Sequence, residues 1–154
     1  KDVLPDGRIS TQLTPVSTVG EKLKSNVDPG DLLILSRGVR FNAGVVRELP
    51  GTSTALNMFY IFTPNNTELL PEFIAGFLNN PATQERLKRF ATGATIPHLK
   101  ADDLGRTRIP VPPLGQQRAY VALIEACLEE KRLLERLSTL RSQQLSAAVG
   151  FSNL

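Results

Sequence analysis

The sequence has 154 residues, 41% of them hydrophobic, and a formal net charge of +3. This hydrophobic content supports one compact domain with a real core plus an appendage. The longest apolar runs, LLIL and MFYIF, are far shorter than the roughly 18 residues of a membrane-spanning helix, so we expect no membrane partner and an intracellular, cytoplasmic protein. The small net charge does not by itself indicate nucleic-acid binding. The opening KDVLPDGRIS has the character of mid-chain sequence, and we expect a piece of a longer protein.

Three β-rich runs occupy the first half of the sequence. A Pro-Gly turn precedes the apolar run LLIL, which ends before Gly38. The runs AGVVREL and ALNMFYIFT follow, separated by the turn-forming PGTST and closed by PNNT. The pattern predicts a small mixed sheet of at least three strands.

From Glu68 the apolar period changes to that of a helix. Apolar residues recur at steps of three and four until Asn79 and Asn80. Pro81 suits the first turn of a second helix, which ends near Phe90. Together with the strands, these helices predict an α+β fold.

A loop, TGATIPHLKADDLG, is predicted after the second helix. Gly93 and Pro97 break any helix there, and Pro97 favours an extended conformation for the residue before it. The next run, RTRIPV, is predicted as a short edge strand, because Pro110 cannot donate to a strand ladder.

A long helix is predicted from near Leu114 to about Val149, because Pro112 and Pro113 are tolerated only before or within a first helical turn. At 1.5 Å per residue it is roughly 50 Å long, which exceeds a small domain. Its apolar stripe belongs either to a helix half-buried on its own domain or to a coiled-coil arm, and the length favours the arm. The single cysteine, Cys127, is interpreted as a small buried hydrophobic residue. The residues predicted to contact a partner helix are Leu123, Ile124, Cys127, Leu134, Leu137 and Leu140.

Basic residues gather in two windows that contain no acid. If the fold brings these windows together, they form one positive face for nucleic acid; otherwise they are ordinary solvated surface. The sequence leaves both interpretations open. Residues 32–47 hold Arg37, Arg40 and Arg47, and residues 86–101 hold Arg86, Lys88, Arg89 and Lys100.

The motifs of common catalytic sites do not occur in the sequence. No Gly-rich phosphate loop lies between a strand and a helix, and His98 and Cys127 alone cannot form a four-ligand zinc site. No serine has the Gly-x-Ser-x-Gly context of a nucleophile, and VPPL lacks the asparagine and aromatic residue of the amino-methyltransferase signature. We therefore expect no catalytic residue, no metal and no cofactor in this chain.

The runs GDLLILSRG, TGATIPHL and LGRTRIPVPPLGQQ, followed by a long helix, together resemble one repeat of the specificity subunit of type I restriction-modification enzymes. The resemblance covers roughly residues 29–149. The family usually has Glu-Gln after the proline pair, where this sequence has Gln116 and Gln117. The change is mild, since glutamine also serves in the first turn of a helix.

The resemblance implies a target recognition domain at residues 1–111, a long spacer or dimerisation helix at 112–150 and a tail at 151–154. Such a domain recognises one half of a split site in double-stranded DNA, and paired antiparallel helices hold two domains apart. The family subunit has no catalysis of its own. It docks two adenine-N6 methyltransferase subunits that use S-adenosylmethionine, and a translocating nuclease subunit joins them. The chain is then a prokaryotic, cytoplasmic protein, either a fragment of a two-domain subunit or a half-subunit that forms a homodimer through its helix.

Reading a DNA sequence needs hydrogen-bonding side chains at base edges and cationic side chains on phosphates. Arg37 and Arg40 are the first candidates for base contacts, because arginine can pair with guanine through two hydrogen bonds. Thr95 and His98 belong to a loop that recurs in the family, so a role in the fold is the alternative for them. The predicted DNA-binding residues are Arg37, Arg40, Asn42, Arg47, Thr92, Thr95, His98 and Lys100, whereas Lys88 and Arg89 are predicted to touch only phosphate or water.

Two other functions stay open at this point. In the first, the chain is a protein-interaction module that does not bind DNA, its long helix serves dimerisation or docking, and its basic windows are plain surface. An enzyme is the third hypothesis, and turnover by the isolated chain would support it.

Overall fold

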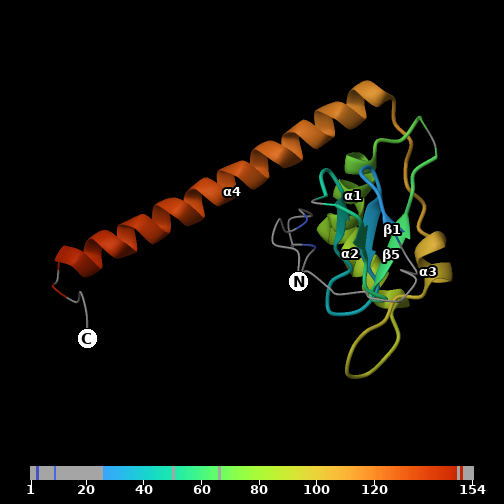
Figure 1. The fold of residues 1–154 in the computed structure, drawn as a ribbon, viewed down its shortest axis with the longest axis horizontal. Helices are drawn as coiled ribbons and strands as arrows, with labels where there is room; N and C mark the ends of the chain where they lie inside the picture. The colour runs from blue at the N-terminus through green and yellow to red at the C-terminus, as the bar shows by residue number, and fades with distance from the viewer. Residues whose placement is uncertain are drawn as a thin grey trace.

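The structure places a small α+β domain ahead of one long helix (Figure 1). This computed structural model describes residues 26–49, 51–65 and 67–148, together with Val3, Ile9 and Gly150. The predicted tail at 151–154 lies outside the described residues, as does most of the segment before residue 26. The elements in chain order are β1 (Asn26–Val27), β2 (Leu32–Leu35), β3 (Ala43–Val45), β4 (Ser53–Thr54), β5 (Phe59–Phe62), α1 (Pro71–Asn79), α2 (Pro81–Phe90), α3 (Ala101–Gly105) and α4 (Leu114–Ala148).

The three predicted β runs form one sheet with the strand order β3-β2-β5. In the central strand, Leu33 lies opposite Gly44 of β3 and Ile61 of β5. Every strand pair within the described residues is antiparallel, the pair of β1 with β4 included, so the sheet is not of mixed direction. The α+β class is confirmed by this sheet and by the helices that follow it.

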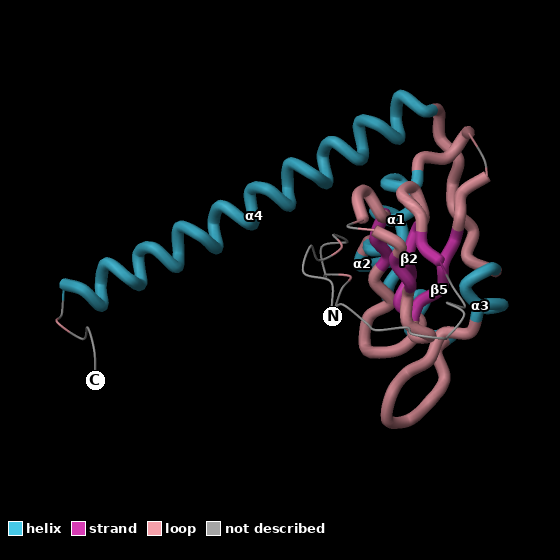
Figure 2. Tube along the Cα trace, viewed as in Figure 1, coloured by secondary structure: helices cyan, strands magenta, loops and turns pink. Residues whose placement is uncertain are grey.

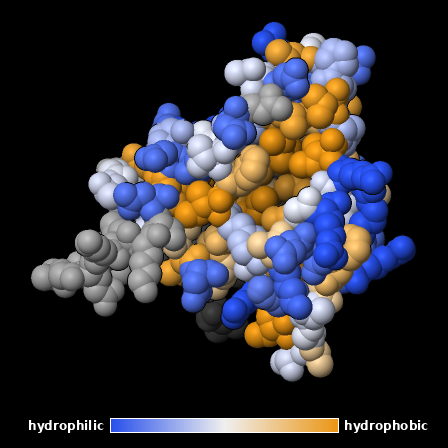
Figure 3. Space-filling model, turned by 90° about the vertical axis from the view of Figure 1, so that its right-hand side faces the viewer, coloured by the Kyte–Doolittle hydropathy of each residue, from blue (hydrophilic) through white to orange (hydrophobic). Residues whose placement is uncertain are grey.

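The two faces of β2 pack into different apolar clusters, because successive side chains of a strand point to opposite sides. Leu32 and Ile34 belong to the main core, which α1 and α2 cover from one side of the sheet (Figure 2). Leu33 faces the other way and packs with Val46 in a second cluster. On the side of the domain that carries α3, hydrophobic surface gathers in the middle with hydrophilic side chains around it (Figure 3).

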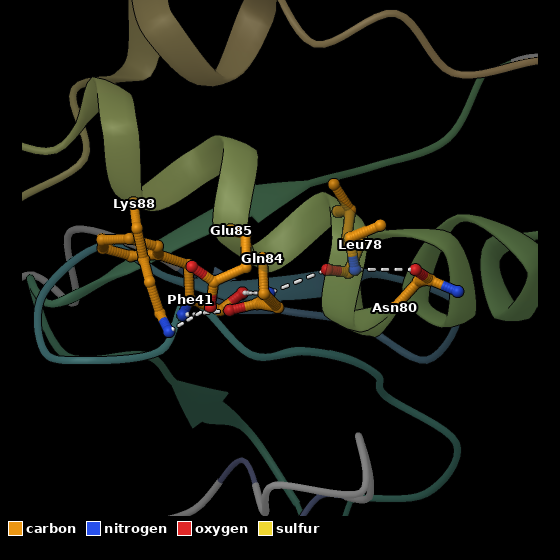
Figure 4. Close-up of polar contacts among 7 residues, drawn as sticks. Phe41, Leu78, Asn80, Gln84, Glu85 and Lys88 are labelled. Carbon is orange, nitrogen blue, oxygen red and sulfur yellow. Dashed lines mark hydrogen bonds and ion pairs between the residues drawn. The ribbon is translucent and has the colours of Figure 1, made fainter.

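Two side-chain amides cover the free edge of β3 and of the chain just before it. Asn79, at the end of α1, accepts a hydrogen bond from the Ala43 N–H and donates one to the Ala43 carbonyl, both at 2.8 Å. Gln84 of α2 accepts from the Phe41 N–H at 2.9 Å and donates to the carbonyl oxygens of Phe41 at 3.1 Å and Leu78 at 2.7 Å (Figure 4). Each amide replaces the neighbouring strand that an edge lacks, and so joins the helices to the sheet.

The long helix α4 was predicted from near Leu114 to about Val149, and the structure confirms it. It spans 35 residues, from Leu114 to Ala148. Its first turns lie against α1, and from Glu129 to Ala148 every residue is exposed as the helix projects from the domain (Figure 1). Within the described parts of the chain, no helix combines the length and hydrophobicity needed to cross a membrane.

The predicted edge strand at RTRIPV is wrong. No residue from Arg106 to Pro113 belongs to a strand. Pro110, Pro112 and Pro113 remove backbone donors from this connection, and the free edge of β3 is already closed by side-chain amides. The segment therefore links α3 to α4 without joining a sheet.

The helices differ from the prediction in two smaller respects. The first begins at Pro71 rather than at Glu68, which suits a proline at the first helical position. The predicted loop after α2 contains the short helix α3, with Asp102 and Asp103 in its first turn. Carboxylates in a first turn lie near the positive, amino-terminal end of the helix dipole and stabilise the helix. The glycine and proline pattern alone does not reveal this helix.

Candidate nucleic-acid interface

Backbone hydrogen bonds join the loop after β2 to the loop after α2. The Gly38 N–H donates to the Pro97 carbonyl, and the Leu99 N–H donates to the Ser36 carbonyl, both at 2.9 Å. As a result Arg37 and His98 lie opposite each other as an antiparallel bridge. The two acid-free basic windows of the sequence therefore do meet, along the segments 36–38 and 97–99.

The second of these loops is a closed turn with a free tip. Thr92 and His98 exchange two backbone hydrogen bonds, of 2.9 Å and 2.7 Å. Gly93 has a φ of +110°, which favours glycine. In Figure 1 this yellow loop projects from the end of the domain opposite the start of α4. Thr95 and Ile96 at the tip are exposed.

The base of the interface is fixed to the core. Leu99 is fully buried in the main cluster, and its carbonyl accepts a hydrogen bond of 2.8 Å from the Tyr60 hydroxyl. The Ser36 hydroxyl donates to the Met58 carbonyl at 2.7 Å. Both loops are thus anchored through β5 and the residues before it, and their exposed parts are presented from a rigid base.

Three cationic side chains surround the joined loops. Arg37, Arg40 and Lys100 are exposed, and none of them has an ion pair with another described residue. Thr92 is exposed as well, and His98 is half-buried, with its Nδ1 atom buried and without a hydrogen-bond partner among the described residues. The exposed members of the predicted set therefore include three cations on or next to the joined loops.

Two residues of the predicted set lie elsewhere. Asn42 is only 7% exposed, because the chain turns inward between Arg40 and β3, so its side chain is not part of the exposed surface of the joined loops. Arg47 lies at the other end of β3 and forms an ion pair of 2.6 Å with Glu125 of α4. The hydrogen bond to Glu125 raises the pKa of Arg47, and the guanidinium serves the junction with α4 rather than the joined loops.

The basic residues of α2 are partly engaged as well. Lys88 forms an ion pair of 2.7 Å with Glu85 and lowers the pKa of that carboxyl through their hydrogen bond (Figure 4). The Arg86 guanidinium lies 6.0 Å from the ring centre of Phe77. Arg89 is exposed at the end of the helix.

A second candidate surface follows the exposed part of α4. Ile124 is half-buried, because it packs against Gly76 of α1. Leu134, further along the helix, is 59% exposed. The predicted burial of Cys127 within this chain is wrong, because the thiol is exposed next to Leu128, the last half-buried residue of α4. The α4 stripe, as we call these exposed apolar residues, consists of Leu123, Cys127, Leu133, Leu134, Leu137, Leu140 and Leu145.

The family model described as type I restriction modification DNA specificity domain matches residues 9–139. The chain belongs to this family. The match includes both joined loops and most of α4, so the DNA specificity domain extends beyond the sheet and its helices. None of the curated proteins compared with the chain matches it significantly.

Within the described part of this specificity domain, acids, histidine and cysteine do not gather as they do at a metal centre. Among the described residues, no group of three or more His, Cys, Asp or Glu side chains could hold a metal ion. His98 lies in the loop of residues 92–98 after α2, whereas Cys127 lies on α4. The polar residues that sequence reasoning missed are Gln84 and Gln117, which are buried and have a hydrophobic residue three or four positions away on the same helix.

Proposed function

We propose that this specificity domain reads one half of a split DNA target with its two joined loops. The observation that carries the proposal is the pair of backbone hydrogen bonds between Gly38 and Pro97 and between Leu99 and Ser36. They bring together two basic segments that are distant in the sequence and leave Arg37, Thr92 and Lys100 exposed beside them. A positive, rigidly supported surface of this kind suits a DNA groove flanked by phosphates.

The residues proposed to contact DNA divide by their chemistry. Arg37 and Arg40 are placed at base edges, since a guanidinium can donate two hydrogen bonds to guanine. Thr92, Thr95 and His98 supply further donors and acceptors, and Lys100 supplies charge for a phosphate. Lys88 and Arg89, on α2, contribute to phosphate attraction.

We further propose that the chain carries no catalysis and works by docking adenine-N6 methyltransferase subunits. S-adenosylmethionine would bind the methyltransferase, which would transfer the methyl group, and the specificity domain would decide where. A translocating nuclease subunit would join the same complex. With these partners the protein would act in the cytoplasm of a prokaryote.

The proposed partner of the α4 stripe is a second α4, supplied by another copy of the chain or by a second repeat of a longer chain. Support comes from leucines that stay exposed along the projecting part of the helix. Leucine side chains repeating along one side of a helix are stabilised when a facing helix covers them. Antiparallel pairing of two identical chains gives a two-fold particle, and so two inverted copies of one half-site.

The test is to produce the chain together with its methyltransferase subunit in cells that lack other adenine methylation, and to map the methylated adenines. The proposal predicts methylation at one split motif, and self-pairing predicts that its halves are inverted repeats. Light scattering on the isolated chain, with and without the methyltransferase, gives the number of copies. Methylation without any sequence motif, or no capture of the methyltransferase, would contradict the proposal.

The α4 stripe also supports a second candidate function, a protein-interaction module for which DNA is not the partner. Its exposed leucines would serve docking in either case. Fluorescence anisotropy with duplex DNA separates the two functions when the methyltransferase is present. Absence of any affinity at low salt would favour the interaction module, because phosphate attraction is strongest there.

A further inference from the structure

The joint between the recognition domain and α4 contains a fully buried polar side chain. Gln117, the fourth residue of α4, has 0% of its surface exposed. Its Oε1 atom accepts a hydrogen bond of 2.9 Å from the Leu70 N–H. Its Nε2 atom donates to the carbonyl oxygens of Glu68 at 2.6 Å and Pro112 at 2.8 Å. One amide therefore ties three chain segments together.

The three hydrogen-bond partners of Gln117 lie just before α1 and just before α4. Leu70 is the residue before α1, and its N–H has no partner within that helix. Pro112 lies just before α4, in a connection with no regular secondary structure. The hydrogen bonds of Gln117 thus fix the start of α4 against the start of α1, and they also fix the chain that leads into it.

The other contacts of this joint are weaker or less directional. The Tyr120 hydroxyl donates a hydrogen bond to the Gly76 carbonyl of α1, but at 3.4 Å it is long. Tyr120 packs edge to face on Phe73, with ring centres 5.4 Å apart, and Ile124 lies against Gly76. The ion pair of Arg47 with Glu125 is largely exposed. Apolar packing tolerates small rotations and an exposed ion pair adds little stability, whereas the three short hydrogen bonds of the buried Gln117 amide lose energy quickly when their angles change.

The length of α4 makes its direction matter. Its 35 residues extend for roughly 50 Å, so a rotation of about 10° at the joint moves the far end by about 9 Å. That displacement equals nearly three base-pair steps of about 3.4 Å. Two recognition domains that are held apart by paired helices can therefore keep a fixed spacing on DNA only if this joint is stiff.

We propose that Gln117 is the positioning residue that sets the direction of α4, and through it the spacing of DNA half-sites that the assembled protein accepts. The role of Gln117 in half-site spacing rests on the function proposed above, whereas its role in stiffening the joint does not. Gln117 touches no DNA in this proposal. It acts through the helix that it orients, and its loss should relax the spacing without changing the sequence of either half-site.

The first experiment measures the joint without DNA, by electron–electron distance spectroscopy between two spin labels. Labels are placed on Arg89→Cys in α2 and Arg136→Cys in α4, in a Cys127→Ser background diluted with unlabelled protein. Both positions are exposed. Gln117→Met removes the three hydrogen bonds at similar volume, and Gln116→Met, at an exposed neighbour, is the matched control.

Gln117→Met is expected to broaden the distance distribution by about 6 Å, which corresponds to about 10° of freedom over the roughly 33 Å of helix between Leu114 and Arg136. Gln116→Met should leave it narrow. If Gln117→Met does not fold, as judged by circular dichroism, Gln117→Glu keeps the acceptor for Leu70 and loses both donated hydrogen bonds, so it should broaden the distribution as well. An unchanged distribution in the folded variants overturns the proposal.

The second experiment measures methylation by the complex on duplexes whose half-sites are separated by different numbers of base pairs. The wild type should accept one spacing, and Gln117→Met should also accept neighbouring spacings while keeping the half-site sequences. A broadened joint with an unchanged spacing preference overturns the role in spacing. A third outcome is that the wild type methylates no split site, although Gln117→Met still broadens the distance distribution. The proposed function and the role in spacing are then both wrong, but the stiffening of the joint by Gln117 stands.

Discussion

Gly93 lies so close to Ile96 that a Cβ added to the glycine would come within 2.7 Å of the Ile96 carbonyl oxygen. This contact is made to backbone, so rotation of a side chain cannot relieve it. Together with the φ of +110°, it makes glycine the residue that closes the loop of residues 92–98, the proposed recognition loop, and presents its exposed tip.

Gly93→Ala should therefore distort the recognition loop and cost about 1–2 kcal/mol of stability, since a Cβ is unfavourable at positive φ. Urea unfolding measures the stability, and anisotropy with the mapped DNA target measures affinity. The matched control is Gly51→Ala, where an added Cβ meets no atom within 4 Å and φ is not positive. If both alanine variants bind DNA like the wild type, the loop geometry does not matter for recognition.

Gln84→Ala should be among the most destabilising changes in the domain. It leaves the Phe41 N–H and two carbonyl oxygens without their partner in a fully buried position, at a cost of about 3 kcal/mol. The free energy of unfolding from urea titration gives the value. The exposed Gln116→Ala should change it by less than about 0.5 kcal/mol. A loss for Gln84→Ala no larger than that of the control would show that water replaces these hydrogen bonds.

The elements with local patterns could be predicted from the sequence. The strands β2, β3 and β5 follow apolar runs between turn residues, and α2 and α4 follow prolines that suit a first helical turn. The apolar period marks the end of α1. The prediction of an edge strand at RTRIPV was wrong, because an extended sequence pattern cannot reveal whether a partner strand has a free edge.

The site could be predicted only in part, because its geometry depends on contacts between distant residues. Both basic windows were visible, but the sequence could not show that Arg47 pairs with Glu125, which lies 78 positions further along the chain. Burial of Asn42 and of Gln117 escaped prediction for the same reason. Amide side chains are usually exposed, and only the folded chain shows which backbone groups need them.

Arg37 and Lys88 should differ in what they contribute to DNA binding. Arg37→Ala should relax the sequence preference, because a base-edge contact of about 1–3 kcal/mol is lost at one position. Lys88→Ala should weaken binding to all sequences alike and reduce the slope of log K against log salt by about 0.9, as expected for one phosphate contact. Binding selections from random duplexes and salt titrations measure the two effects. Equal sequence profiles for wild type and Arg37→Ala would rule out the base contact.

Cys127 offers a direct test of helix pairing, because it is the only cysteine in the sequence and is exposed on the α4 stripe. If two α4 helices pair through the stripe, the facing helix covers the thiol. Its alkylation by iodoacetamide should then slow as the protein concentration rises, in proportion to the dimer fraction from light scattering. Leu134→Lys places a charge in the same stripe and should restore fast alkylation. Thr139→Cys in a Cys127→Ser background has no stripe residue three or four positions away, so its thiol lies on the opposite side of the helix and should react at one rate throughout. A dimer in which Cys127 reacts as fast as in the monomer would mean that the chains associate through a different surface.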